Sequence, residues 1–190
     1  MSSTEPKLHR PAGLALPLQP LDELYAHQGL PLPPIEQIAG AEVPEPFRTL
    51  LVHRNDMTPT LERFHGERIH IQVLRRERQG DTYVREVVLR LDDSEAPVEF
   101  GANRVRLDLF SPEARWMILQ EKLPLGRILK EHAVPHTSRP AAFFRVQSDA
   151  LINRALGLPA GTQLYGRKVT ISDPQGRPLS EVVEILPPME

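Results

Sequence analysis

The chain has 190 residues, of which 40% are hydrophobic, and its formal net charge is −2. This length and composition are typical of one globular domain, and the near balance of charge gives no general attraction to nucleic acid or to anionic membranes. The chain contains no cysteine, which excludes disulfides, thiolate nucleophiles and cysteine-ligated metals. The polar start MSSTEPKLHRPAG is unlike a signal peptide and no apolar run reaches membrane-spanning length, so we expect a cytoplasmic protein.

Proline is concentrated near the start of the chain, where residues 1–46 hold nine of the 20 prolines. Proline interrupts helices and central strands. We therefore expect residues 1–46 to form an extended arm, ordered only where its leucines find a groove, and not a three-helix DNA-binding head. In this interpretation residues 47–190 form the globular domain.

Helix and strand patterns alternate through the rest of the chain. A helix capped by Thr58 is expected to end at Gly66, and the strand near Gly101 is expected to contain a bulge because its apolar positions change parity there. Antiparallel strands with inserted helices predict an α+β fold with a sheet of about six strands. The expected strands are 67–76, 83–91, 97–109, 140–147, 163–172 and 177–186, and the expected helices are 47–57, 58–66, 111–122, 123–132 and 148–157.

The segment YVREVVL, residues 83–89, places a charge on an apolar strand face. Tyr83, Arg85, Val87 and Leu89 alternate onto one face, which we expect to be directed toward the core. The face with Glu86 is expected to meet water. Burying an unpaired arginine costs several kcal/mol, so the fold must bring an anion to Arg85, from a side chain or from a ligand.

The last two strands form a predicted hairpin around DPQG. If Ser172 pairs with Arg177, Arg167 pairs with Val182 and lies diagonally to Glu184 on one largely apolar face. One interpretation is a structural ion pair between arginine and glutamate. The other is a ligand carboxylate, because two core-directed arginines and one glutamate leave a positive charge uncompensated.

Five segments in this order resemble the chorismate pyruvate-lyase family: DMTPTLERF, YVREVVL, LPLGRIL, LYGRKVTI and GRPLSEVVEILP, within residues 48–188. The resemblance implies a lyase, active without metal or cofactor, that converts chorismate to 4-hydroxybenzoate or an isomer and to pyruvate, in a role like that in ubiquinone biosynthesis. It also implies a sheet that encloses the ligand beneath two helical flaps. The ligand-sensing domain of GntR-type transcription regulators shares this fold, so the alternative is a non-catalytic module that binds or senses small carboxylates or aromatic acids.

The resemblance assigns roles to four residues of this sequence, and the hairpin pattern adds Arg167 as a fifth candidate. Arg85 is expected to bind the ring carboxylate and to be catalytic together with Glu184, which is expected at the 4-oxygen of the ring. The backbone amides of Met57 and Leu125 are expected to bind substrate. Arg167 is a candidate for the second carboxylate of chorismate, and its role as a structural partner of Glu184 stays open.

The seven histidines give no pattern of metal ligands. His65 and His70 are five residues apart across an expected helix-to-strand boundary, and no carboxylate cluster completes the set. We therefore expect no metal site. The expected partner is a small aromatic acid or chorismate, with neither nucleic acid nor membrane, and the protein is expected to be a monomer or a weak dimer.

Overall fold

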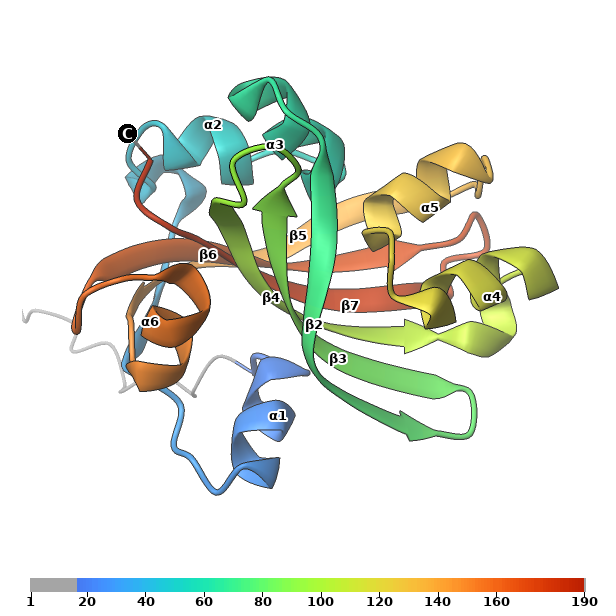
Figure 1. Cartoon of the computed structure of the whole chain (residues 1–190), viewed down its shortest axis with the longest axis horizontal. Coiled ribbons are helices and arrows are strands. Elements are labelled where there is room, and N and C mark those ends of the chain that lie inside the picture. The colour runs from blue at the N-terminus through green and yellow to red at the C-terminus, as the bar shows by residue number, and fades with distance from the viewer. Residues whose placement is uncertain (1–16, 190) are drawn as a thin grey trace, which may run out of the picture.

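The computed structural model describes residues 17–189, which contain one seven-stranded antiparallel sheet and six α-helices (Figure 1). The strand order is β1-β5-β6-β7-β4-β3-β2. The predicted α+β class is confirmed, and the sheet has one strand more than the six expected. The strands are β1 (Ile35–Ile38), β2 (Ile69–Gln79), β3 (Thr82–Leu91), β4 (Pro97–Arg106), β5 (Thr137–Gln147), β6 (Gln163–Ser172) and β7 (Pro178–Leu186). The helices are α1 (Leu21–His27), α2 (Phe47–Leu51), α3 (Met57–His65), α4 (Pro112–Gln120), α5 (Leu125–Glu131) and α6 (Ala150–Leu156).

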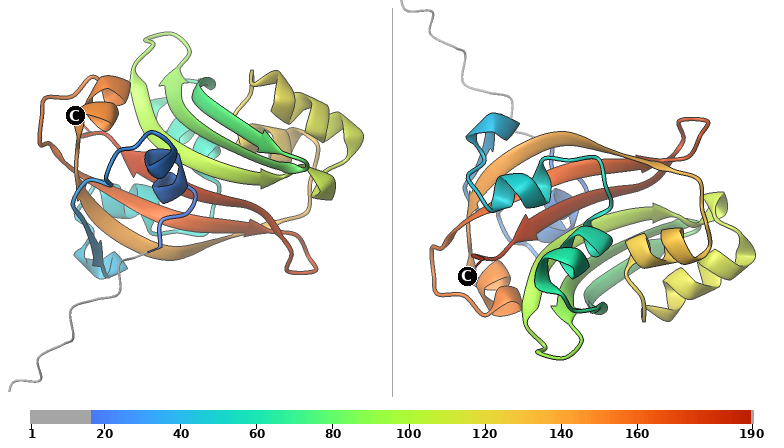
Figure 2. Two further views of the ribbon diagram at one scale, coloured as in Figure 1. Left: turned by 90° about the horizontal axis from the view of Figure 1, so that it is seen from below. Right: turned by 90° about the horizontal axis from the view of Figure 1, so that it is seen from above.

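The helices cover both faces of the sheet. Figure 1 shows α1 and α6 below the sheet, and Figure 2 shows α2, α3, α4 and α5 above it. We call these sides the α1/α6 face and the α3/α5 face. None of the helices within residues 17–189 is long and apolar enough to cross a membrane.

The α1/α6 face is one continuous apolar core. Val88, Phe100 and Phe144 of the sheet are fully buried there against both helices. The expectation that Glu86 of β3 meets water is wrong, because its residue is only 2% exposed. Gln28, which follows α1, donates a hydrogen bond of 3.2 Å to the Glu86 carboxylate, so the segment around α1 covers this part of the sheet.

Residues 17–46 contain regular structure where we expected an extended arm. The prolines flank α1 and do not interrupt it, since Pro20 occupies the N-cap position and LDELYAH contains no proline. β1 pairs with β5 as the edge strand that brings the sheet to seven. The boundary at residue 46 stays a prediction, but the segment before it supplies part of the core.

Burial of α1 leads to a stability prediction. Leu24 is 1% exposed, so we expect Leu24→Ala to lower the free energy of unfolding by about 2 to 5 kcal/mol, through lost apolar burial and the cavity left behind. Leu30→Ala is the matched control, because Leu30 is 43% exposed and should change stability by about 0.5 kcal/mol or less. Urea titration of the full chain measures both. Equal, small effects would mean that α1 contributes little to the fold.

Two local expectations need correction. Helix α3 starts at Met57 with Asp56 at its N-cap position, so Thr58 is not the cap, although the helix does end at Gly66 in the left-handed conformation. The irregularity of β4 lies at Val98, where Leu89 pairs with Glu99 and Arg90 with Pro97, and not near Gly101. The apolar positions around Gly101 change parity because β4 is buried on both faces.

The β6–β7 hairpin has a different register from the predicted one. Arg167 lies directly opposite Glu184, whereas we expected Val182 in that position. The turn closes one residue later than assumed, between Asp173 and Arg177, and a bulge in β7 shifts the pairing by one more residue. Because a shift of two residues preserves the side-chain alternation, the predicted common face of Arg167 and Glu184 is confirmed.

Candidate functional site

The α3/α5 face contains two apolar clusters with buried polar residues between them. One cluster packs beneath α4 and α5, and the other beneath α2 and α3. Between them lies a cavity of about 50 Å³, lined mostly by buried residues, which has room for only a few water molecules. All five residues proposed from the sequence line this cavity: Met57, Arg85, Leu125, Arg167 and Glu184.

Arg167 and Glu184 form a buried ion pair. The Nε atom of Arg167 donates to Oε2 of Glu184 at 2.5 Å, and the Arg167 side chain is 1% exposed. Its terminal nitrogens donate to the carbonyl oxygens of Leu51, His53 and Asn55 at 3.0, 3.1 and 3.2 Å. Arg167 therefore ties the α2–α3 connection to the sheet, and the interpretation as a structural partner of Glu184 agrees with this geometry.

Unlike Arg167, Arg85 forms no ion pair within residues 17–189. It is completely buried, and its one hydrogen bond among the described residues runs from Nε to Oδ1 of Asn103 at 3.0 Å. Its Nη1 and Nη2 atoms have no partner within residues 17–189. Burial lowers the pKa of Arg85, and the nearby charges of Tyr83 and Glu121 offset part of this effect. The guanidinium lies 5.8 Å from the centre of the Tyr83 ring. No carboxylate within residues 17–189 therefore forms an ion pair or a hydrogen bond with the guanidinium of Arg85.

A second carboxylate, missed at the level of sequence, lines the same cavity. Glu99 of β4 is 4% exposed, and its Oε2 atom has no partner among the described residues. Burial, followed by the nearby charge of Glu184, raises the pKa of Glu99 well above its ordinary value. The alternation of β4 could have predicted this position. Without a bulge at Gly101, Glu99 and Asn103 lie on the same face of the sheet as Arg85.

Gly101 makes room for this carboxylate. It lies between Val87 of β3 and Glu184 of β7 in the pairing of the sheet. A Cβ atom at this position would lie 3.0 Å from Oε1 of Glu99 and 3.3 Å from the carbonyl oxygen of Val183. The glycine thus leaves a gap over β4 that the Glu99 side chain uses.

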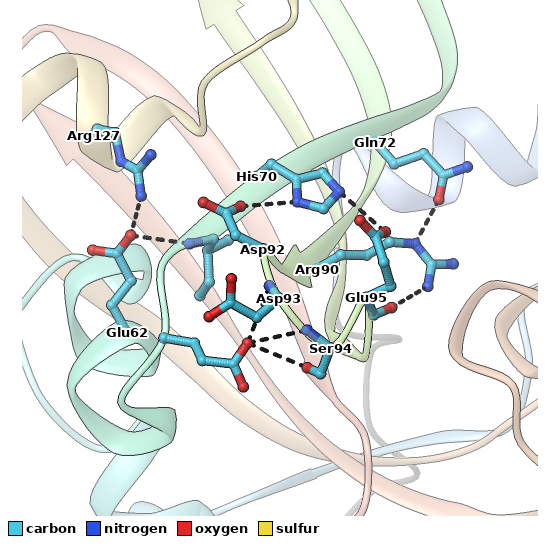
Figure 3. Close-up of polar contacts among 11 residues, drawn as sticks. Glu62, His70, Gln72, Arg90, Asp92, Asp93, Ser94, Glu95 and Arg127 are labelled. Atoms are coloured by element: carbon cyan, nitrogen blue, oxygen red, sulfur yellow. Dashed lines mark hydrogen bonds and ion pairs between the residues drawn. The ribbon is translucent and has the colours of Figure 1, made fainter.

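Helices α3 and α5 close the cavity, and they lie side by side above the sheet in Figure 2. Their first turns touch, because a Cβ atom on Gly126 would lie 3.0 Å from Oγ1 of Thr58. Arg127 of α5 forms an ion pair with Glu62 of α3, and the same carboxylate accepts a hydrogen bond of 3.2 Å from the backbone N–H of Ile69 (Figure 3). We call α3 and α5 together the lid.

The first residues of the two lid helices are Met57 and Leu125. The first N–H groups of a helix have no acceptor within that helix, and neither helix has a side-chain cap. Both residues line the cavity. The lid thus brings two backbone segments with donor capacity to the same space as the guanidinium of Arg85.

A more open hollow of about 510 Å³ borders the cavity. Asp56 and Ser138 line both spaces, and the Asp56 carboxylate accepts a hydrogen bond of 2.6 Å from Ser138 and contacts Nε2 of His136 at 2.9 Å. No group of three or more histidines and carboxylates among residues 17–189 is arranged to hold a metal ion. The hollow is also lined by four basic side chains for which no ion pair is found within the described residues: Arg54, Arg63, Lys130 and Arg139.

No family model and no curated protein matches this chain, but solved structures share its fold. PhnF from Mycobacterium smegmatis is 14% identical, with 87% of this chain and 92% of that chain covered and a TM-score of 0.53. The effector domain of PhnF, in a separate structure, is 12% identical, with 70% and 88% covered and a TM-score of 0.53. A GntR-family transcriptional regulator from Bacillus cereus is 12% identical, with 63% and 92% covered and a TM-score of 0.47.

The fold is that of GntR-type ligand-binding domains. The expected shared fold is thus confirmed, whereas the expectation of an enzyme is wrong. PhnF and its effector domain, both with TM-scores above 0.5, are not named as lyases, so a lyase that releases pyruvate, or a role like that in ubiquinone biosynthesis, is not supported. The ion pair with Arg167 gives the Glu184 carboxylate a structural contact, and the roles expected for the five site residues stay predictions.

Proposed function

We propose that this chain is a non-catalytic sensing module whose effector is a small carboxylic acid, bound in the cavity beneath α3 and α5. The observation that carries the proposal is the guanidinium of Arg85, which is fully buried in the cavity wall with both terminal nitrogens unpartnered. A carboxylate can accept two parallel hydrogen bonds from such a group, and the pairing compensates the buried charge.

In this proposal the other residues have distinct tasks. The backbone amides of Met57 and Leu125 donate to the ligand from the lid, and the Arg167–Glu184 pair positions the sheet and the α2–α3 connection around it. The hollow outside Asp56 and Ser138 provides access, because its basic side chains favour a ligand that approaches with its carboxylate first. The ligand enters when the lid moves, since the closed cavity holds only a few waters.

A thermal unfolding series tests the proposal. Benzoate, 4-hydroxybenzoate and butanoate are compared with benzamide, a neutral isostere of benzoate. Acids that bind should raise the midpoint temperature of unfolding. At a ligand concentration of one hundred times the Kd, the free energy of unfolding should increase by about 2.7 kcal/mol. Benzamide should have no such effect, because it brings no charge to Arg85.

Two results would contradict the proposal. One is equal stabilisation by benzamide and benzoate, which would mean that the cavity does not select for a carboxylate. The other is the appearance of pyruvate when chorismate is mixed with the protein, because a sensing module should leave chorismate unchanged.

A further inference from the structure

The cavity wall contains two buried ionisable groups, a guanidinium and a carboxyl group, each with unpartnered atoms. On one side are Nη1 and Nη2 of Arg85, and on the other is Oε2 of Glu99. The remaining buried ionic residues of the sheet at this site, Arg167 and Glu184, are paired with each other. A ligand that carries only a carboxylate would therefore satisfy Arg85 and leave the Glu99 oxygen without a partner, which is costly in a buried site.

The two groups are separated along the strands. Arg85 lies opposite Asn103, and Glu99 lies opposite Leu89, which is four residues further along β3. At the rise of a β-strand this corresponds to about 13 Å between backbone positions. Both side chains line one cavity. A ligand that lies along the strands can therefore reach the guanidinium of Arg85 with one end and the carboxyl group of Glu99 with the other.

We infer that the ligand is a zwitterion, an amino acid whose ammonium group lies several bonds from its carboxylate. The carboxylate binds the guanidinium of Arg85, and the ammonium binds the carboxylate of Glu99. This inference rests on the proposed function for the role of Arg85. Beyond that function, the ligand has an ammonium group as a hydrogen-bond donor, and Glu99 is the residue that selects ligands with this group.

Four other ionisable side chains line the cavity and can influence the titration of Glu99. Asp56 faces it from the segment before α3, Arg85 from β3, Arg167 from β6 and Glu184 from β7. The parts of α3 and α5 that line the cavity contribute no titratable side chain. Burial raises the pKa of Glu99, so Glu99 in the empty site holds a proton more tightly than an exposed carboxyl group does.

The sign of the pH effect differs between two classes of ligand. A zwitterion must expel the proton of Glu99 when it binds, so its affinity should rise as the pH rises toward the pKa of Glu99 in the empty site. A simple carboxylate gains nothing from ionised Glu99 and is repelled by it, so its affinity should fall over the same range. An alkylammonium group stays charged throughout, because its pKa is near that of lysine, about 10.4.

Calorimetry on the full chain tests the inference. The probes are ω-amino acids from 3-aminopropanoate to 6-aminohexanoate, each compared with the alkanoate of the same chain length. We expect at least one amino acid to bind about tenfold or more tightly than its alkanoate, a difference of about 1.4 kcal/mol. Titration in two buffers of different ionisation enthalpy should show proton release for that amino acid and none for the alkanoate.

Glu99→Gln keeps the shape of the side chain but removes its charge. We expect this variant to lose the preference for the amino acid and the proton release, while it binds the alkanoate as well as the unmodified protein does or better. Glu86→Gln is the matched control, because Glu86 is also buried with a raised pKa but lies on the α1/α6 face. If Glu99→Gln does not fold, proton release by the unmodified protein decides the question.

The outcomes separate this inference from the proposed function. Alkanoates that bind as tightly as the amino acids, without proton release, would overturn the zwitterion and leave a carboxylate-binding site in place. If neither class binds, and if benzoate and benzamide also fail to differ in thermal unfolding, the proposed function fails and this inference with it.

Discussion

Replacing Arg85 by methionine should abolish binding of carboxylates and should not weaken the fold. Arg85 is the buried cation of the cavity that forms no ion pair within residues 17–189, and its loss is expected to cost about 2 to 5 kcal/mol of affinity, at least about thirtyfold in Kd. Methionine fills much of the same volume, and exchange of a buried charge for an apolar side chain is often neutral or stabilising by about 1 to 4 kcal/mol. The loss of the hydrogen bond to Asn103 offsets part of that gain, by about 1 kcal/mol.

Binding and stability are measured on the same variant, by calorimetry with benzoate and by urea titration. Arg68→Met is the control, because Arg68 is exposed and should change neither quantity by more than about 0.5 kcal/mol. A variant that keeps full affinity for benzoate would remove Arg85 from the site. A large loss of stability with unchanged affinity would give Arg85 a structural role only.

Replacing Arg167 by methionine should have the opposite effect on stability. The change removes the partner of Glu184 and three hydrogen bonds to backbone carbonyls, and it leaves Glu184 buried beside Glu99. Breaking a buried pair in this way is expected to cost about 3 to 5 kcal/mol, a large share of the stability of a domain.

A double-mutant cycle separates the pair from its surroundings. Combined with Glu184→Leu, Arg167→Met should recover part of the lost stability, because no unpaired carboxylate is then left in the core. The free energies of unfolding of the unmodified protein, the two single variants and the double variant are all measured in urea. Together they give the coupling energy between Arg167 and Glu184. Strict additivity of the two changes would mean that the ion pair contributes nothing, and that Arg167 acts through its carbonyl contacts alone.

Strand alternation made much of the site predictable. A period of two placed Arg85 on the core-directed face of β3, and the same rule placed Arg167 and Glu184 on one face of the last hairpin. The exact pairing could not be predicted, because a bulge in β7 and the closing of the turn at Asp173 each shift the register by one residue. The predicted face of each side chain was still correct, because the two shifts add up to two residues and a shift of two residues does not change the face.

Other features depend on contacts that local patterns do not contain. Proline content predicted an extended arm, but the proline-free stretch of α1 finds a groove on the sheet and buries Leu24 and Tyr25. Glu99 was missed because a change of parity was taken for a bulge, whereas the strand is covered on both faces. The expected lyase activity came from resemblance to a family, and the same fold serves sensing domains, so fold alone did not decide between catalysis and binding.

In the proposed function, the lid also governs the kinetics of the site. Where α3 and α5 touch above a space for a few waters, a ligand cannot collide directly with Arg85. Association then proceeds only while the lid is open, and the observed rate levels off at the opening rate as the ligand concentration increases. Dissociation meets the same barrier, so release of the ligand requires opening of the helix contacts around the Glu62–Arg127 pair. Such a site reports the average concentration of its effector over the time that the ligand stays bound and does not follow brief fluctuations.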